Sequence, residues 1–191
     1  MNAKDSKLID APALSRRKSL SLLLGTALAG LMGGATTAAA AAMGRDLQSG
    51  WCWCEKCGGL FCGPSGKGGA CPAGGRHDGR KSLRIMAVIG GEIPGKRQGK
   101  WACCSKCQCM FYDGFRTKGM CPAGGGHSSS GSEPYAIDLG ETGLGREGGW
   151  RWCKHCYGLH FAGRRNVVSL CPHGGPHEST PSLHFALNHA G

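Results

Sequence analysis

Aromatic residues are scarce in this chain, and acidic residues are outnumbered. Phe, Trp and Tyr together make up 7% of the 191 residues, and 12 Asp and Glu stand against 23 Lys and Arg. So few large apolar side chains argue against a large hydrophobic core, and something besides apolar burial must help to hold the fold. The sequence also lacks Gly-x-Ser-x-Gly, His-Glu-x-x-His and any isolated pair of carboxylates. These absences argue against an enzyme and leave a thiol oxidoreductase as a minor alternative.

Glycine, cysteine and histidine are plentiful instead. The chain has 35 Gly, 13 Cys and 8 His. Cysteine at this density indicates either a framework of disulfides or a set of metal sites. The spacing of the cysteines, described below, decides between these two.

The N-terminal segment has the composition of an export signal. Residues 1–43 contain no Cys, His or aromatic residue, carry Arg16 and Arg17, and are uncharged from residue 19 onward. A basic start, an apolar stretch and small residues at 38–42 predict a signal peptide over residues 1–42. The paired arginines resemble a twin-arginine signal, so we expect a periplasmic or secreted protein. An ordinary secretory signal and an uncleaved membrane anchor are the alternatives.

The rest of the chain is one unit written three times. The first motif cysteines, Cys54, Cys104 and Cys153, lie 50 and 49 residues apart, and all five tryptophans fall within the motifs. A fixed period of this length marks a repeat architecture. We assign repeat 1 to residues 48–97, repeat 2 to 98–147 and repeat 3 to 148–191.

Each repeat predicts β-structure. Trp-x-Trp-Cys and a Leu-Phe segment flank a Cys-x-x-Cys knuckle, a pattern that indicates a hairpin with the knuckle at its tip. A strand with apolar residues at every second position should follow the motif histidine, with polar Arg84, Asp138 and His184 between them. Its apolar residues are Leu83, Ile85 and Ala87; Tyr135, Ile137 and Leu139; and Leu183, Phe185 and Leu187. No helical pattern occurs outside the signal, so the predicted fold class is all-β.

The motif cysteines have the spacing of zinc ligands. Each repeat reads Cys-x2-Cys, then 13 or 14 residues, then Cys-x5-His. Three cysteines cannot pair among themselves, whereas three thiolates and an imidazole complete a tetrahedral structural zinc site. We therefore predict three structural Cys3His zinc sites, with iron or copper as the alternative metals. The predicted ligands are Cys54, Cys57, Cys71 and His77; Cys104, Cys107, Cys121 and His127; and Cys153, Cys156, Cys171 and His177.

Four cysteines lie outside this pattern, all in the first two repeats. Cys52 and Cys62 straddle one hairpin, and Cys103 and Cys109 straddle the next. A disulfide across each hairpin is an open possibility in an exported protein, although the two pairs are not in the same register.

The third repeat is rich in additional histidines, namely His155, His160, His173, His184 and His189. A second metal site that includes His155 and His173 is one interpretation. Solvated surface imidazoles are the simpler one, because no two of these histidines have ligand spacing within one element.

Three copies of an all-β unit predict closure around a pseudo-threefold axis, as in a β-trefoil. Strands and tryptophans would form a shared centre, with the zinc knuckles at the periphery. The alternative is three independent zinc-ribbon beads on Gly-rich linkers. The strands need a partner to cover their apolar face, which favours the closed form.

The motif Trp-x-Trp-Cys-x-x-Cys-x-x-Leu-Phe with Cys-Pro-Ala-Gly-Gly-x-His resembles a tandem repeat of exported bacterial and some fungal proteins. The resemblance extends over residues 48–191, with Ala102 and Cys103 departing from it in repeat 2 and His173 in repeat 3. It implies a cysteine-rich, zinc-bearing β-module and carries no activity with it.

The function expected from these features is non-catalytic binding at the cell envelope or outside the cell. Residues 43–191 keep 18 basic and 10 acidic side chains, an excess that suits a glycan or an acidic envelope polymer. Sequestration or handling of zinc or copper is the alternative function. We expect a monomer with no membrane span after residue 42 and no nucleic-acid partner, because the protein is expected to leave the cell.

Overall fold

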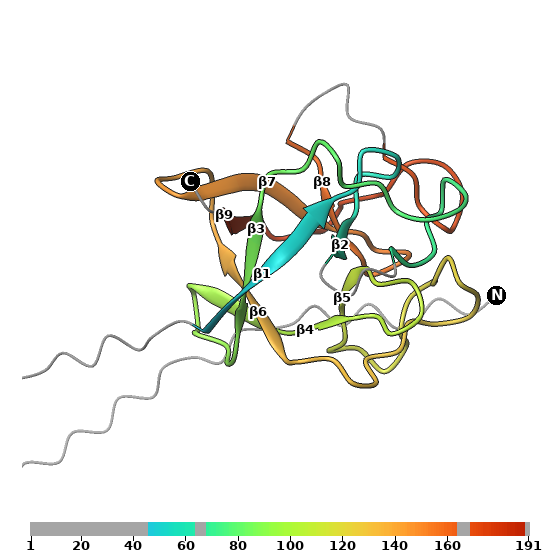
Figure 1. Cartoon of the computed structure of the whole chain (residues 1–191). Coiled ribbons are helices and arrows are strands. Elements are labelled where there is room, and N and C mark those ends of the chain that lie inside the picture. Colours follow the sequence, from blue (N-terminus) through green and yellow to red (C-terminus); the bar gives the residue numbers. More distant parts are fainter. Residues whose placement is uncertain (1–45, 64–67, 164–168, 190–191) are drawn as a thin grey trace, which may run out of the picture. The chain divides into compact units, whose positions relative to one another are not determined.

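Nine β-strands and no helix form the regular structure of the residues described by the computed structural model, which are 46–63, 68–163 and 169–189 (Figure 1). The strands are β1 (Asp46–Trp53), β2 (Leu60–Cys62), β3 (Ile85–Ile89), β4 (Arg97–Cys103), β5 (Met110–Tyr112), β6 (Tyr135–Leu139), β7 (Arg146–Trp152), β8 (Leu159–Phe161) and β9 (Phe185–His189). The predicted signal peptide at 1–42 lies outside these residues. Within them, no helix is long and apolar enough to cross a membrane.

In each repeat a long strand forms a hairpin with a short strand, which confirms the hairpin prediction. β1 pairs antiparallel with β2, β4 with β5 and β7 with β8. The first half of each long strand pairs instead with the third strand of its repeat, β3, β6 or β9. The register shifts between the two halves, where Gly50, Lys100 and Gly149 have φ of 89°, 63° and 87°. At this bulge the backbone is in the left-handed region and the long strand bends, so that one half pairs with the short strand and the other half with the third strand.

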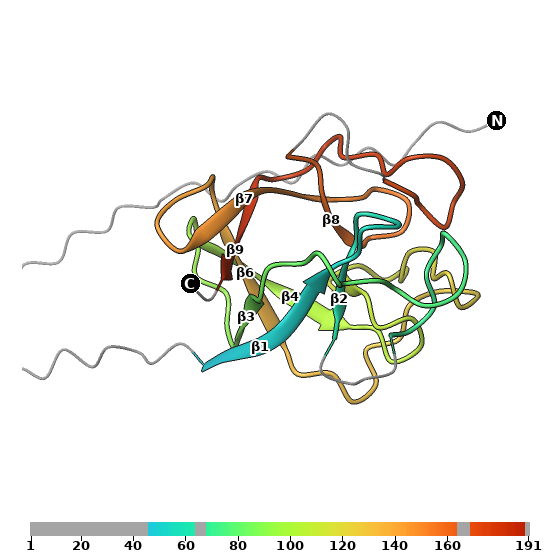
Figure 2. The same cartoon turned by 45° about the horizontal axis from the view of Figure 1, so that its top comes forward.

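The third strands of the repeats pair with one another in a ring. The end of β3 pairs with the start of β6, the end of β6 with the start of β9, and the end of β9 with the start of β3. Each repeat therefore contributes strands to one closed sheet with approximate threefold symmetry (Figure 2). The alternative of independent beads is wrong, because the third strands pair across repeats and one core contains residues of all three.

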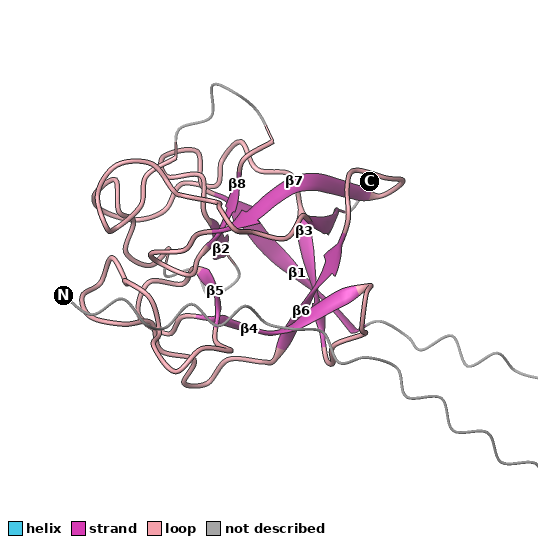
Figure 3. Ribbon diagram, turned by 180° about the vertical axis from the view of Figure 1, so that it is seen from behind, coloured by secondary structure: helices cyan, strands magenta, loops and turns pink. Residues whose placement is uncertain are grey.

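A second ring joins the short strands. Isolated bridges connect Phe61 to Cys109, Phe111 to Gly158, and Gly59 to His160, so that β2, β5 and β8 contact one another in turn. The long loops that carry the third cysteine and the histidine of each motif gather beside this ring (Figure 3). The domain therefore has a sheet end, formed by β3, β6 and β9, and a loop end.

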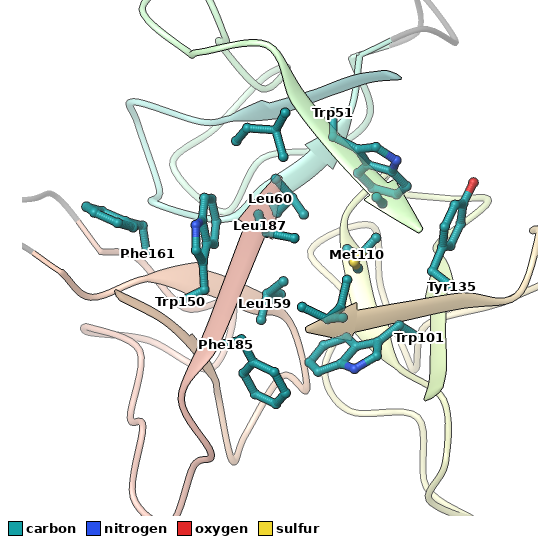
Figure 4. Close-up of a cluster of buried hydrophobic side chains, with 13 residues drawn as sticks. Trp51, Leu60, Trp101, Met110, Tyr135, Trp150, Leu159, Phe161, Phe185 and Leu187 are labelled. Carbon is teal, nitrogen blue, oxygen red and sulfur yellow. The ribbon is translucent and has the colours of Figure 1, made fainter. Parts of the chain in front are cut away.

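Each repeat supplies the same four positions to the main hydrophobic core. One is the first tryptophan of the motif, and Trp51, Trp101 and Trp150 are each at most 1% exposed. In Figure 4 these three side chains surround Leu60, Met110 and Leu159, the second set of equivalent residues. The other two sets are Ile85, Tyr135 and Phe185, and Ala87, Ile137 and Leu187, with Phe161 in addition. Three tryptophans at the centre give the core much of its buried area despite the low aromatic content.

Two expectations about the third strands are wrong. Leu83 and Leu183 were expected inside, yet they are 54% and 51% exposed, and the strands begin two residues later. The serine before each leucine donates its hydroxyl to the carbonyl of that leucine, which therefore lies in the turn ahead of the strand. Asp138 was expected on a solvated face, but it is buried with Arg97, whose Nε lies 2.8 Å from its carboxylate.

The first strands begin slightly ahead of the assigned repeat boundaries. β1, β4 and β7 start at Asp46, Arg97 and Arg146, whereas the repeats were assigned from 48, 98 and 148. The assigned boundaries themselves remain a prediction from the sequence period.

Candidate metal centres

The twelve predicted ligands are gathered into three clusters, one in each repeat. In every cluster the sulfur and nitrogen donor atoms lie within 4.8 Å of one another. All nine cysteines are buried, as are two of the histidines, and His177 is partly exposed. The clusters are Cys54, Cys57, Cys71 and His77; Cys104, Cys107, Cys121 and His127; and Cys153, Cys156, Cys171 and His177.

The hairpin tip places the first two sulfurs of each cluster. The amide of Gly58 donates to the carbonyl of Cys54 at 2.8 Å, and that of Cys54 donates to the carbonyl of Gly59 at 2.9 Å. The same pair of bonds recurs in the other two hairpins. The residue after the second cysteine has φ of 60–76° whether it is Gly58, Gln108 or Tyr157. This tight, left-handed turn brings two thiols three residues apart to the same side of the chain.

A second turn places the third sulfur and the imidazole. In repeat 1 the amide of Cys71 donates to the carbonyl of Gly75 at 2.8 Å, and that of Gly74 donates back to Cys71 at 2.9 Å. The two glycines have φ of 87° and 64°, a conformation that suits residues without a side chain. The chain then returns so that His77 Nδ1 lies 3.5 Å from Cys57 Sγ, and the corresponding distance is 3.4 Å in both other repeats.

The donor set fits a metal ion that binds sulfur and nitrogen. The first and third sulfurs of the clusters are 4.0, 3.9 and 3.8 Å apart, too far for a covalent bond and suitable for two ligands of one ion. Hydrogen bonds from Cys57 and Cys71 hold the pKa of the Cys54 thiol far below its usual range. The pKa values of Cys104 and Cys153 are lowered in the same way by their own cluster partners. Each cluster thus stabilises a thiolate, the form of cysteine that binds metals.

The cysteines of the clusters also raise the pKa of two histidine ligands. Burial lowers the pKa of His77, but hydrogen bonds to Cys54 and Cys71 outweigh burial and raise it to about 9. His127 behaves alike, with burial opposed by Cys104 and Cys121 and a pKa of about 9. The sulfurs therefore favour a positive charge at the position of the imidazole, as expected of a site that holds a cation.

An aromatic ring covers each histidine ligand. Phe61 stacks on His77 with ring centroids 4.9 Å apart, and Phe111 stacks on His127 at 4.7 Å. In repeat 3 the covering ring is His160, which lies 4.4 Å from His177. Burial and the neighbouring His177 lower the pKa of His160 to about 3, so this ring is neutral. His160 therefore serves as a packing ring in the position of a phenylalanine.

The remaining histidines do not form a further site within the described residues. His155 and His173 stack face to face at 4.2 Å, and His155 Nε2 lies 2.8 Å from a carboxylate oxygen of Glu178. Parallel rings do not point their nitrogens at a common ion. No other group of three or more metal-ligating side chains is found in the part of the chain that the structure describes. His184 contacts Arg151 and Glu141 at the surface.

The clusters surround the axis at the loop end of the domain, which corrects the expectation that they lie at the periphery. A cavity of about 20 Å³ is lined by residues of all three repeats, among them Cys57, His127 and Cys156. The loop ahead of the third cysteine in each repeat closes on the knuckle of the next one around the ring. A side chain at Gly69 would meet the carbonyl of Cys107 at 1.9 Å, and one at Gly119 would meet that of Cys156 at 2.4 Å. Leu170 of repeat 3 donates its amide to the carbonyl of Cys57 at 3.1 Å.

The four additional cysteines lie on two different faces of their hairpins. Cys62 and Cys103 pack against the main core, whereas Cys52 and Cys109 pack against the metal clusters. Side chains alternate along a strand, and Trp51, not Cys52, is opposite Cys62. The disulfides considered across each hairpin, Cys52–Cys62 and Cys103–Cys109, would each join opposite faces and are therefore wrong. Cys109 Sγ instead lies 3.2 Å from His77 Nε2, on the far side of that ligand.

A serine in each repeat ties the hairpin to the loop that follows the motif histidine, and our sequence interpretation missed it. The hydroxyls of Ser82, Ser132 and Ser182 each accept the amide of a long-strand residue at 2.8 Å, from Trp53, Cys103 and Trp152. These bonds fix the loop that begins at the imidazole. The signal was present, since a serine stands five residues after the motif histidine in all three repeats.

The three clusters are the metal-ligating groups found among the described residues. Comparison of the chain with protein-family models, with curated proteins and with solved structures found no match.

Proposed function

We propose that this protein is an exported, non-catalytic binding module whose fold is stabilised by three structural zinc ions. One observation carries the proposal: three buried Cys3His clusters surround the axis of a shared core. The main core cluster contains thirteen of the described residues, which is small for such a domain, and cross-links at its loop end would compensate for that.

Zinc is the metal that best suits the donor sets. Three thiolates and one imidazole in a compact, buried group are typical of structural zinc, which prefers four ligands in a tetrahedron. When bound, zinc would cross-link the hairpin tip of each repeat to its second loop. Four protein ligands leave no position for a water or substrate, and this supports a structural rather than a catalytic role.

Export is supported by a resemblance at the N-terminus of the sequence. Residues 1–42 resemble a twin-arginine signal, a class that carries proteins already folded. A folded protein could leave the cell with its thiols protected by metal. Replacing Arg16 and Arg17 by lysine should retain the protein in the cytoplasm, as measured by cell fractionation. Export of this variant at the original level would contradict the twin-arginine assignment.

The surface between repeats 2 and 3 has the character of a glycan site. A shallow pocket of about 670 Å³ is lined by Thr117, Met120, His155 and Tyr157, among others. The hydroxyls of Thr117 and Tyr157 are 2.9 Å apart and can bind sugar hydroxyls together. Next to the pocket, Phe115 contacts the rings of Tyr112, Trp152 and Tyr157. Aromatic faces beside paired polar groups are what a sugar ring requires.

The charge of the chain favours an acidic polymer as the ligand. Residues 43–191 carry eight more basic than acidic side chains, and Arg116 is exposed beside the pocket. Such an excess attracts polyanions and weakens as salt rises. We therefore propose an acidic polysaccharide rather than a neutral one.

The alternative function, metal handling, is less well supported. Sulfurs that are buried at the junctions of three repeats should exchange their ion slowly. Native mass spectrometry of the intact protein should find three zinc ions and nine thiols protected from alkylation. Rapid loss of metal to a weak chelator would instead favour the handling role.

Binding is tested by titrating the zinc-loaded protein with an acidic polysaccharide and its neutral counterpart. The acidic polymer should bind more tightly, and Phe115→Ala should weaken binding about tenfold. Leu83→Ala is the matched control, because Leu83 is also an exposed apolar side chain but lies away from the pocket. Equal binding by both polymers, or equal loss in both variants, would contradict this assignment of the site.

A further inference from the structure

The three junctions between repeats are closed by equivalent pairs of residues, and one pair differs in kind. Between repeats 3 and 1, Phe161 and Trp53 line one pocket. Between repeats 2 and 3, Tyr112 and Trp152 both contact Phe115, with ring centroids 5.0 and 5.6 Å from it. The equivalent residues between repeats 1 and 2 are Cys62 and Cys103. Two thiols thus stand where the other junctions have large aromatic rings.

These two thiols are in contact. The side chains of Cys62 and Cys103 are close enough to interact, and both pack against the main core. A shared neighbour brings them together: the Gln108 carbonyl accepts the Cys62 amide at 2.7 Å and lies 3.7 Å from Cys103 Sγ. The bridge between Phe61 of β2 and Cys109 holds the two backbones side by side at this place.

The other cysteines do not compete for either thiol. Nine belong to the metal clusters. Cys52 and Cys109 lie on the opposite face of their hairpins, where Cys109 contacts His77. Within the described residues, Cys62 and Cys103 are therefore the two non-ligand thiols that pack against the main core, whereas Cys52 and Cys109 pack on the side of the metal clusters.

We propose that Cys62 and Cys103 are a site of oxidative modification that forms a disulfide between repeats 1 and 2. A small-molecule or protein disulfide serves as the oxidant. One cysteine thiolate attacks that disulfide and releases the first thiol, and the second cysteine displaces the other half from the mixed disulfide. One S–S bond forms in the protein, one is reduced in the oxidant, and the two protons end on the two released thiols.

This bond would join the ring of repeats at the junction that lacks an aromatic pair. It closes a loop of roughly 40 residues and so reduces the conformational freedom of the unfolded chain. The proposal depends on neither export nor glycan binding. It requires only that the nine ligand sulfurs remain protected while this pair reacts.

The test is oxidation of the purified, metal-loaded protein with oxidised glutathione. Because both side chains are partly buried, the reaction should run for hours at a pH of about 8.5. Remaining thiols are then alkylated and the protein is digested with trypsin. Peptides 57–67 and 101–106 should be joined, with a mass about 2 Da below their sum. Fragmentation must locate the bond, because these peptides also contain Cys57 and Cys104.

Two variants separate this pairing from the others. Cys103→Ser should leave Cys62 as a mixed disulfide with glutathione, and the double variant Cys52→Ser with Cys109→Ser should still form the bond. Metal content should stay at the level of the reduced protein. Oxidation should raise the unfolding temperature of the original chain and leave that of Cys103→Ser unchanged.

Several results would overturn the proposal. These are Cys62 and Cys103 remaining open to alkylation after oxidation, each carrying its own glutathione, or a bond to Cys52, Cys109 or a ligand. Since the peptide map of the original chain decides among them, the test does not depend on the variants folding.

Discussion

The loop end and the sheet end of this domain have the same symmetry but tolerate different amounts of change. At the loop end, the four ligands and the glycine pair after the third cysteine are identical in all three repeats. At the sheet end, equivalent positions hold residues of different chemistry. Metal coordination requires particular donor atoms, whereas packing requires only that volumes and polar groups be matched.

One pair of equivalent positions shows this contrast clearly. Where β1 meets β3, Leu47 is paired with Val88. At the same place in repeat 2, Arg97 is paired with Asp138, and both side chains are at most 8% exposed. In repeat 3, Arg146 is paired with Asn188. An apolar pair, an ion pair and a polar pair thus fill one structural position, and Arg146 also lies 3.7 Å from the carboxylate of Asp138.

Metal removal is the strongest way to test the comparison. Each structural zinc can contribute on the order of 10 kcal/mol, more than the usual stability of a whole domain. We expect chelation under reducing conditions to unfold the domain, as measured by loss of the near-ultraviolet circular dichroism of its buried tryptophans. Adding zinc back should restore the signal. An unchanged spectrum in protein shown to be free of metal would mean that the sheet end is stable by itself.

A single ligand can be compared with a cysteine two residues away. Cys54→Ser should lose one metal ion and lower the free energy of unfolding by more than about 3 kcal/mol. Cys52→Ser should change it by no more than about 1 kcal/mol, because Cys52 is half-buried and belongs to no cluster. Urea unfolding with metal analysis measures both. Equal effects of the two variants would contradict the assignment of Cys54 as a ligand.

The polar pair of repeat 2 tests the tolerance of the sheet end. Asp138→Val should destabilise the domain by about 3–5 kcal/mol, because it leaves the buried Arg97 without its carboxylate. Adding Arg97→Leu creates the apolar pair of repeat 1 and should recover much of this loss, although the partly exposed Arg146 still lacks the Asp138 carboxylate. Urea unfolding of both single variants and the double variant gives the coupling energy. A double variant as unstable as the sum of its single changes would show that the pair is not interchangeable.

The same contrast explains how much could be predicted from the sequence. The grouping of twelve ligand residues, the hairpins and the inward positions of Trp51 and its equivalents all follow from spacing within one repeat. Ligands and alternating strands are local patterns, so one copy of the motif suffices to find them.

Features that depend on how repeats meet could not be predicted in this way. Asp138 is polar in the sequence and was placed on the solvated face, because its partner Arg97 lies on a different strand. The cysteine pairs were sought within hairpins, whereas Cys62 contacts Cys103 of the next repeat. The position of the clusters around the axis likewise follows from closure of the ring, which no single repeat encodes.

Substitution of the ring that covers a histidine ligand has the smallest expected effect on the stability of the domain. His160 is neutral and buried, its Nδ1 has no hydrogen-bond partner among the described residues, and its Nε2 lies 3.2 Å from Ser179 Oγ. His160→Phe exchanges one hydrogen bond for relief of the unsatisfied nitrogen, so stability should change by no more than about 1 kcal/mol. The reverse change, Phe61→His, should cost about 1–3 kcal/mol, because Gly79 stands where repeat 3 has Ser179 and offers no hydroxyl.

Urea unfolding of the metal-loaded protein measures the stability of both variants, and metal content should be unchanged in each. If Phe61→His cost no more than His160→Phe, the serine would not be what makes histidine acceptable in repeat 3. The covering position would then tolerate substitution as freely as the sheet end does, even though it touches a metal ligand.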